Sequence, residues 1–365
     1  MFKLPKPPEQ LQIASNKLSE KIISEIKKQG SINFAKFMQL ALYDRDYGYY
    51  SLANSILGED GDFITSPEIS ELFAYCLAEN IFYYSNITIN NILEIGAGTG
   101  KLASDIISFV KQNNLNLENY YILEVSANLK SKQQEILQKT HPDYFHKIIW
   151  MDTLPNNFIG AIIANELLDA MPCSLINCHN GIFSRHVIYE NNKFNWLDMP
   201  LDEQEKKALA EITEYNLQNY ENYKTELPIM HSPWLASIYD SMQIGKVLLI
   251  DYGYLQKEFY HPKRSEGTLR CHYRQLAHED PFFYPGLQDI TYHVDFSRVI
   301  NSAKELGFTI ISYETQAQFL LANGLLDYAK QNLSALEQKL QSQDILKLTD
   351  PGQMGEIFKV LVLDK

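Results

Sequence analysis

A glycine-rich segment at residues 92–102 is the part of this 365-residue sequence whose residue types and spacing suit chemistry most directly. An apolar run ends in the acid Glu94 and continues into three glycines at alternate positions, Gly96, Gly98 and Gly100. Glycines let the backbone turn tightly and approach a ligand with no Cβ in the way, and a helix that follows them presents free N–H groups. The segment therefore predicts a nucleotide-binding turn between a buried strand and a helix.

Two phosphate-binding motifs do not match this turn. The dinucleotide pattern G-x-G-x-x-G requires a glycine where Lys101 stands. The P-loop requires Ser or Thr where Leu102 stands and a glycine where Ile95 stands. The pattern E-x-G-x-G-x-G instead resembles the nucleotide loop of class I S-adenosylmethionine (SAM) methyltransferases, and an acid beside the loop suits the sulfonium cation of SAM. By this resemblance, the candidate cofactor-binding residues are Glu94, Gly96, Ala97, Gly98 and Gly100.

A second acid lies where a site of this kind needs one. Glu124 is in the predicted strand 121–125, 30 residues after Glu94, and a carboxylate there can accept hydrogen bonds from both ribose hydroxyls. Val125 and Asp152 are further cofactor candidates, Asp152 as a contact of the adenine amine. The alternative is that these acids only end strands or loops in solvent.

The predicted fourth strand, residues 159–164, ends in another polar cluster. In this fold the loop after that strand faces the transferred methyl group, and a carboxylate there can hold an amino group in line. Glu166 is the first candidate for binding a cationic nitrogen of the substrate, and Asn165 and Asp169 are secondary candidates. The alternative is a helix N-terminus capped by Asn165, where the helix dipole favours acids.

Composition excludes some classes of partner. The chain has 32 Lys and Arg residues against 45 Asp and Glu residues, so its formal net charge is −13. A nucleic-acid binder needs a basic face to neutralise phosphates, and the sequence has no basic run longer than two residues, so we expect no nucleic-acid partner. The four cysteines form neither a zinc-type CxxC pair nor a disulfide ladder, so we expect no metal.

The first residues, MFKLPKPPEQLQ, lack the apolar core of a secretion signal and the Arg-rich pattern of an import leader. No window approaches the roughly 18 unbroken apolar residues that a membrane-spanning helix needs. We therefore expect a soluble protein of a reducing compartment, without membrane insertion.

From about residue 90, short apolar runs alternate with helical periodicity, which predicts a doubly wound α/β fold. The runs predict a mostly parallel, seven-stranded sheet with strands at residues 91–95, 121–125, 148–150, 159–164, 246–251, 308–313 and 356–363. Upstream, apolar residues at three- and four-residue steps behind polar caps predict helices at residues 15–29, 33–42 and 66–84.

Two insertions interrupt the strand and helix alternation. Residues 173–243 open with a hairpin that turns at Asn180-Gly181 and continue with a charged amphipathic helix over 202–223. Residues 254–292 are poor in periodicity and rich in Pro, Gly, Tyr and charge.

The pattern also predicts a division into domains. Residues 1–85 would form an N-terminal helical extension that covers the site. Residues 86–365 would form the methyltransferase domain, in which the two insertions make a smaller lobe on the substrate side.

Taken in order, these motifs resemble those of the MidA / NDUFAF7-type SAM-dependent methyltransferases over nearly the whole chain. So many ordered blocks make chance similarity implausible. The blocks are residues 37–44, 47–50, 61–70, 94–100, 124–126, 165–172, 251–253, 267–270, 285–291, 293–296 and 354–360.

The resemblance implies a class I methyltransferase fold, with SAM as cofactor and S-adenosyl-L-homocysteine as product. Its mitochondrial members are protein-arginine methyltransferases that make symmetric dimethylarginine on a core subunit of respiratory complex I, and assembly factors for that complex. This sequence lacks an import leader, and its loop is Gly-Ala-Gly-Thr-Gly where relatives often carry Pro and Arg. We therefore expect a bacterial, cytoplasmic member, with a homodimer as one oligomeric state it allows.

By analogy, residues 61–70 cover the SAM pocket, with Thr65, Ser66 or Glu68 as ligands. The alternative is an ordinary capped helix.

The second insertion offers further candidates for a substrate cleft in Arg270, Asp289 and His293. His293 suits a catalytic base because the unperturbed pKa of histidine lies near neutrality. The alternative is a structural histidine.

The activity expected from this resemblance is methyl transfer from SAM to a protein nitrogen, an exposed arginine guanidinium of a complex I-type subunit. Glu166 and Asp169 would orient the nitrogen and disperse its charge. A protein of net charge −13 with carboxylates beside its methyl donor favours a cationic substrate group. Two alternatives stay open: an assembly chaperone that retains the SAM site, and a small-molecule methyltransferase.

Overall fold

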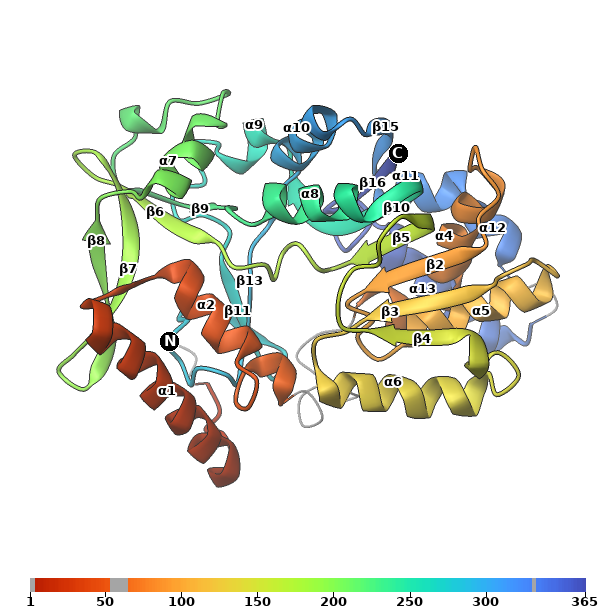
Figure 1. The fold of residues 1–365 in the computed structure, drawn as a ribbon, viewed down its shortest axis with the longest axis horizontal. Coiled ribbons are helices and arrows are strands. Elements are labelled where there is room, and N and C mark those ends of the chain that lie inside the picture. The colour runs from red at the N-terminus through yellow and green to blue at the C-terminus, as the bar shows by residue number, and fades with distance from the viewer. Residues whose placement is uncertain (1–3, 53–64, 330–332) are drawn as a thin grey trace. The chain divides into compact units, whose positions relative to one another are not determined.

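The computed structural model describes residues 4–52, 65–329 and 333–365, which form two compact units (Figure 1). The sheet unit comprises Ile64–Leu167, Leu235–Gly253 and Ile300–Lys365. The insertion unit comprises Met1–Phe63, Leu168–Trp234 and Tyr254–Val299. The domain boundary predicted between residues 85 and 86 stays a prediction.

The sheet unit contains the doubly wound sheet. Its strands are β2 (Asn91–Ile95), β3 (Asn119–Leu123), β4 (Ile148–Met151), β5 (Phe158–Asn165), β10 (Met242–Tyr254), β15 (Thr309–Thr315) and β16 (Phe358–Asp364). They lie in the order β15-β16-β10-β5-β2-β3-β4, and β16 runs antiparallel to both of its neighbours while the other pairs are parallel. Central strands such as β5 are mostly buried and apolar, as expected of a sheet covered on both faces. The predicted seven-stranded, mostly parallel α/β sheet is therefore confirmed.

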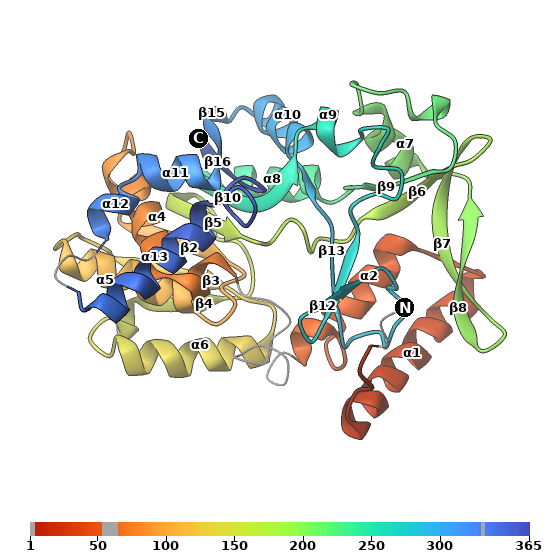
Figure 2. The ribbon, with the colours of Figure 1, turned by 180° about the vertical axis from the view of Figure 1, so that it is seen from behind.

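The helices that lie wholly in the sheet unit are α3 (Ser66–Ile69), α4 (Glu71–Tyr83), α5 (Lys101–Gln112), α6 (Ala127–Thr140), α11 (Gln316–Ala322), α12 (Leu325–Tyr328) and α13 (Ala335–Thr349). Two further helices, α8 (His231–Ser241) and α10 (Phe296–Leu306), begin in residues of the insertion unit and end in residues of the sheet unit. α4 packs against α5 and α12 in both views (Figures 1 and 2). The prediction of one helix over 66–84 is wrong, because Ser70 has an extended backbone and its side chain accepts a hydrogen bond from the Leu72 N–H. Serine favours such caps over helix interiors, so the chain starts a new helix there.

The insertion unit combines helices with two small antiparallel sheets. α1 (Glu9–Gln29) and α2 (Phe34–Tyr43) lie side by side (Figures 1 and 2). α1 starts earlier than predicted, whereas α2 starts after Asn33, whose side chain accepts from the Lys36 N–H. No described helix, α1 included, is long and apolar enough to cross a membrane.

The predicted hairpin is confirmed by β6 (Ser174–Cys178) and β7 (Ile182–Glu190), which pair antiparallel. Both turn residues have positive φ, 50° at Asn180 and 137° at Gly181, which these residue types tolerate well. The larger sheet has the order β1-β7-β6-β9, with β8 paired to β7, and the smaller has the order β12-β11-β13. The other strands of these two sheets are β1 (Ile32–Asn33), β8 (Lys193–Met199), β9 (Tyr223–Leu227), β11 (Arg270–Tyr273), β12 (Leu276–His278) and β13 (Asp289–Thr291).

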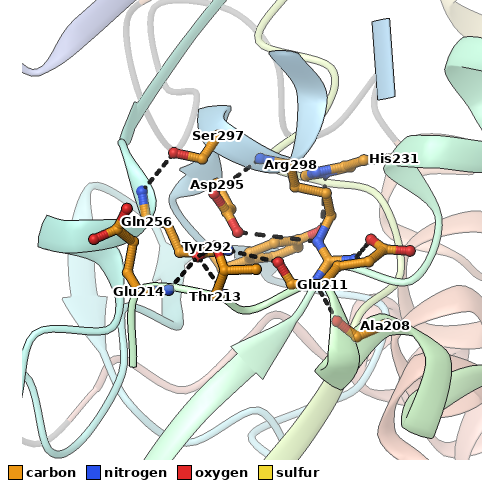
Figure 3. Close-up of polar contacts among 10 residues, drawn as sticks. All are labelled: Ala208, Glu211, Thr213, Glu214, His231, Gln256, Tyr292, Asp295, Ser297 and Arg298. Atoms are coloured by element: carbon orange, nitrogen blue, oxygen red, sulfur yellow. Dashed lines mark hydrogen bonds and ion pairs between the residues drawn. The ribbon is translucent and has the colours of Figure 1, made fainter. Parts of the chain in front are cut away.

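The prediction of a helix over 202–223 is wrong in its length. Asp202 caps α7 (Glu203–Ala210) through a capping box, as the charge pattern suggests. Beyond α7, the N–H groups of Thr213 and Glu214 donate to Oε1 of Gln256 at 2.8 and 3.0 Å (Figure 3). These N–H groups are therefore held by a side chain distant in sequence, and the helix does not continue.

Arg298 is the centre of a buried polar network in the insertion unit (Figure 3). Its guanidinium pairs with Glu211, donates to the Ala208 carbonyl oxygen at 2.7 Å, and has its Nε 3.9 Å from the carboxylate of Asp295. Asp295 is fully buried, and burial raises the pKa of its carboxyl group. The network joins the first insertion to residues 295–298, which follow the second insertion in the sequence.

Replacing Arg298 with methionine is expected to lower the free energy of unfolding by about 3 kcal/mol, because it leaves the buried Asp295 carboxylate without its cation. Urea denaturation followed by circular dichroism measures this change. Arg45→Met removes the same charge at an exposed position and is expected to change stability by less than about 0.5 kcal/mol. Equal stability of the two variants would show that the Arg298 network contributes nothing.

Candidate active site

The glycine turn lies at the carboxyl ends of β2 and β3. Gly96, Gly98 and Gly100 have φ values of 74°, 52° and 85°, a region that L side chains rarely adopt. The Gly96 N–H donates to the Leu123 carbonyl oxygen at 3.0 Å, which ties the turn to the end of β3. Because β2 lies between β3 and β5, the turn sits where the strand order reverses, and open α/β sheets bind their ligands there. The predicted strand, turn and helix at this position are confirmed.

Glu94 is buried at the end of β2, with only 2% of its surface exposed. The Tyr120 hydroxyl donates to its Oε2 at 2.7 Å. Burial raises the pKa of Glu94 to about 7, although the Tyr120 hydrogen bond opposes this shift. The carboxylate is therefore not a strand end in solvent, and it changes charge near neutral pH.

Glu124 lies one residue beyond β3, which ends at Leu123 and not at the predicted residue 125. Its carboxylate accepts from the Ser126 N–H at 2.9 Å and from Nε2 of Gln133 at 3.0 Å. Burial raises the pKa of Glu124, and these hydrogen bonds oppose the shift. A carboxylate has about four lone-pair sites, so the two bonds leave capacity to accept further hydroxyl donors.

Gln133 is a buried residue of this site that the sequence analysis missed. Its Nε2 donates to the Gly98 carbonyl oxygen and to Glu124, both at 3.0 Å, and its Oε1 accepts from the Trp150 indole at 3.0 Å. One side chain thus fixes the glycine turn and the acid relative to each other. The available clue was its helical spacing, four residues from each of two buried leucines, Leu129 and Leu137.

Other cofactor candidates differ in exposure. Ala97 is buried in the turn, whereas Val125 is 74% exposed and offers apolar surface beside Glu124. The Asp152 side chain is 90% exposed, and its nearest cation is Lys130 at 3.4 Å. These residues stay predictions.

Glu166 follows β5 with φ 48°, a rare conformation for a residue with a side chain. Its N–H donates to the Ile250 carbonyl oxygen at 2.8 Å, and its Oε1 accepts from Nδ2 of Asn165 at 3.1 Å and from the Ser66 N–H at 3.4 Å. A Cβ placed on Gly96 would meet the Leu167 side chain at 3.1 Å, so the chain after Glu166 lies against the glycine turn. Residues 166–173, which follow Asn165, form bends and turns and no helix, so the alternative of a helix capped by Asn165 is wrong.

The segment that begins at Thr65 contacts the site through the Ser66 N–H and the Glu68 carboxylate. Thr65 makes no side-chain cap bond, and the Ser66 hydroxyl donates to Oε1 of Gln316 at 3.0 Å, a bond within the core. Glu68 accepts a hydrogen bond from the Thr99 hydroxyl in the glycine turn. The first part of the predicted cover, residues 61–64, lies outside the described residues.

Asp169 and His293 belong to the insertion unit, and each contacts other residues of that unit. Asp169 is buried, and its carbonyl oxygen accepts from the Tyr292 N–H at 3.1 Å. The His293 N–H donates to the Thr268 hydroxyl at 3.0 Å, and its ring packs on Tyr254 with ring centroids 5.0 Å apart.

The pKa of His293 differs from that of an unperturbed histidine. Burial, followed by the nearby charges of Arg264 and Arg270, lowers its pKa to about 4. The imidazole is therefore neutral at pH 7 and is a weak base. Of the other cleft candidates, Asp289 is buried and accepts from the Tyr50 hydroxyl at 3.3 Å, and Arg270 pairs with Glu279 at 3.1 Å.

The sheet order, the glycine turn and the acids behind it define a class I SAM-dependent methyltransferase. Residues 76–314 match the family model described as "Putative S-adenosyl-L-methionine-dependent methyltransferase", and the chain belongs to this family. It is similar over its full length to a crystal structure from Burkholderia thailandensis bound to S-adenosyl-homocysteine, with 34% identity, a TM-score of 0.92 and 95% of that chain covered. Its cofactor is SAM.

Curated relatives extend the same similarity to mitochondrial proteins. The Drosophila melanogaster "Protein arginine methyltransferase NDUFAF7 homolog, mitochondrial" is 25% identical over 98% of this chain and 88% of the relative. The Danio rerio "Protein arginine methyltransferase NDUFAF7, mitochondrial" is 27% identical over 93% of this chain and 84% of the relative. The resemblance to the MidA / NDUFAF7-type family is thus confirmed.

Proposed function

We propose that this methyltransferase acts on a protein nitrogen, an arginine guanidinium. The observation that carries the proposal is Glu166, whose carboxylate is held by Asn165 and Ser66 beside the glycine turn. Guanidinium is always protonated in water, and a carboxylate can bind it in a fixed, bidentate orientation. The names of the relatives, which are protein arginine methyltransferases, support this substrate class.

The cofactor would be held by residues of the sheet unit. In this proposal the backbone at Gly96, Gly98 and Gly100 approaches the ligand, and Glu124 accepts from its ribose hydroxyls. When bound, SAM supplies a methyl group on a sulfonium cation, and Glu94 is the nearby acid that complements it. The further cofactor contacts we propose are Ala97, Val125, Asp152, Asn165, Thr65 and Ser66.

At the reacting nitrogen, Glu166 would orient the guanidinium and disperse its positive charge, which positions a nitrogen lone pair for in-line attack. The proton lost from that nitrogen then passes to solvent or to a carboxylate. Asp169 is a second acid for this role, and its contribution rests on the sequence pattern. His293, neutral at pH 7, would serve as a hydrogen-bonding group rather than a strong base.

Mass spectrometry of a strain that lacks the protein tests the proposal. We expect one or more arginines to lose methyl groups and to regain them with the wild-type gene. Glu166→Gln and Gly98→Val should not restore them. An unchanged arginine methylation pattern in the deletion strain would contradict the proposal.

The finer assignment follows the family resemblance. We propose a complex I-type subunit as the methylated partner, a bacterial cytoplasm as the compartment, and a homodimer as the assembly to test. If a SAM-binding-deficient variant, Gly98→Val, fully restored complex I assembly, the assembly-chaperone alternative would be favoured over catalysis.

SAM affinity is expected to rise roughly tenfold between pH 6 and pH 8, because a group with a pKa of about 7 passes from about one tenth to about nine tenths ionised. The ionised Glu94 attracts the sulfonium cation, whereas the protonated form does not. Isothermal titration calorimetry at several pH values measures the change. The same measurement on Glu94→Gln is the control, because the SAM affinity of that variant changes with pH only through other groups. A ratio of wild-type affinity to variant affinity that stays constant with pH would contradict this role of Glu94.

A further inference from the structure

A pocket of about 320 Å³ follows α9 (Gln256–Phe259) in the insertion unit. Its lining residues are Glu258, His261, Lys263 and Arg264. Two of these residues, Lys263 and Arg264, are basic and a third is a histidine, in a protein whose net charge is −13. The pocket lies outside the set of residues assigned above to methyl transfer.

The backbone of the pocket is a tight turn. The Arg264 N–H donates to the His261 carbonyl oxygen at 2.8 Å, and Pro262 occupies the second turn position, where its fixed φ is favoured. The Lys263 N–H donates to Nδ1 of His261 at 3.2 Å. Because Nδ1 accepts, the neutral ring carries its proton on Nε2, which makes Nε2 a hydrogen-bond donor.

Arg264 is held in place by groups that leave its outer nitrogens available. Its guanidinium carbon lies 4.4 Å from the centroid of the Tyr254 ring, and its Nε donates to the Glu258 carbonyl oxygen at 3.2 Å. Within the described part of the chain, no carboxylate forms an ion pair with Arg264 or Lys263. A guanidinium that is already fixed in one plane loses less conformational freedom on binding a planar anion than a mobile side chain would lose.

A second arginine, Arg270, lies near this part of the insertion unit, and its charge is paired with Glu279 at 3.1 Å. Arg264 and Arg270 both disfavour protonation of His293, so both guanidinium groups lie near that ring. Glu258 is the one opposing charge among the lining residues. The Glu258 carboxylate repels a doubly charged phosphate more strongly than a singly charged carboxylate. The planar guanidinium of Arg264 also matches the planar geometry of a carboxylate.

We propose that this pocket binds a carboxylate of an acidic segment on a protein partner. The site selects aspartate or glutamate through Arg264, Lys263 and Nε2 of His261. The proposed function enters only in identifying that partner as the methylated protein, since carboxylate binding is independent of methyl transfer. The substrate segment then carries an acid in addition to its arginine.

Fluorescence anisotropy on the full chain, with a short labelled polyglutamate peptide and a polyglutamine peptide of equal length, tests the pocket. We expect the polyglutamate peptide to bind more tightly, and Lys263→Gln/Arg264→Gln to weaken it about tenfold, as loss of charged hydrogen bonds implies. Lys257→Gln removes a lysine of α9 that does not line the pocket and should change affinity by less than about twofold. Glu258→Gln should tighten binding roughly threefold, a gain that misfolding cannot produce.

Affinity of Lys263→Gln/Arg264→Gln within about twofold of wild type would overturn the proposal, as would weaker binding by Glu258→Gln. Inorganic phosphate and acetate serve as competitors. Displacement of the peptide by phosphate at far lower concentration than by acetate would overturn the carboxylate assignment in favour of a phosphate site. Polyglutamate binding is also measured in Glu166→Gln, where retention supports the pocket even if the arginine methylation test fails.

Discussion

Glu166→Gln is expected to lower the rate of methyl transfer by at least about 100-fold, while SAM affinity stays within about threefold of wild type. Glutamine keeps the size and hydrogen-bonding shape of the side chain but removes the negative charge that binds a guanidinium. The orientation of that charge is set by Asn165, by the Ser66 N–H and by a backbone φ of 48°. Because these contacts are fixed before substrate arrives, the lost charge is not replaced by rearrangement.

Initial rates of methyl incorporation into protein from the deletion strain measure the effect, and calorimetry measures SAM binding. Glu135→Gln makes the same chemical change at an exposed position of α6 and should leave both quantities unchanged. A full rate in Glu166→Gln with normal SAM binding would remove Glu166 from the reaction. A loss of SAM binding equal to the loss of rate would instead assign Glu166 to the cofactor.

Features that depend on local residue types were predictable from the sequence. The central strands β2 and β5 are mostly apolar, because a strand buried on both faces of a sheet has few positions for polar side chains. The glycine turn was predictable because three alternate positions with positive φ favour glycine over residues that carry a Cβ. Glu94 and Glu124 followed from the motif, although their burial did not.

Features that depend on distant partners were not predictable. Gln133 looks like one more polar residue of a Lys- and Gln-rich helix until the structure pairs it with Gly98, Glu124 and Trp150. α7 ends early because Gln256, far along the chain, takes the next free N–H groups. The low pKa of His293 likewise arises from burial and from two arginines that no local pattern connects to it.

Gly98→Val is expected to lower SAM affinity by at least about 100-fold, because it affects both the shape of the turn and the space above it. A β-branched residue at φ 52° is strained by about 1–2 kcal/mol. A Cβ on Gly98 would meet no protein atom within 4 Å, so the added side chain would project into space that the proposed ligand occupies. A shift of the turn would also disturb the Gly98 carbonyl oxygen that accepts from Gln133.

Gly30→Val separates strain from ligand exclusion, because Gly30 ends α1 with φ 82° and a Cβ added there would also meet no atom within 4 Å. Both variants should lose a similar amount of thermal stability, since the strain is of the same kind. Calorimetric titration with SAM should then show normal affinity in Gly30→Val and little or no binding in Gly98→Val. Normal SAM affinity in Gly98→Val would place the cofactor away from the glycine turn, and equal losses in both variants would trace the effect to stability alone.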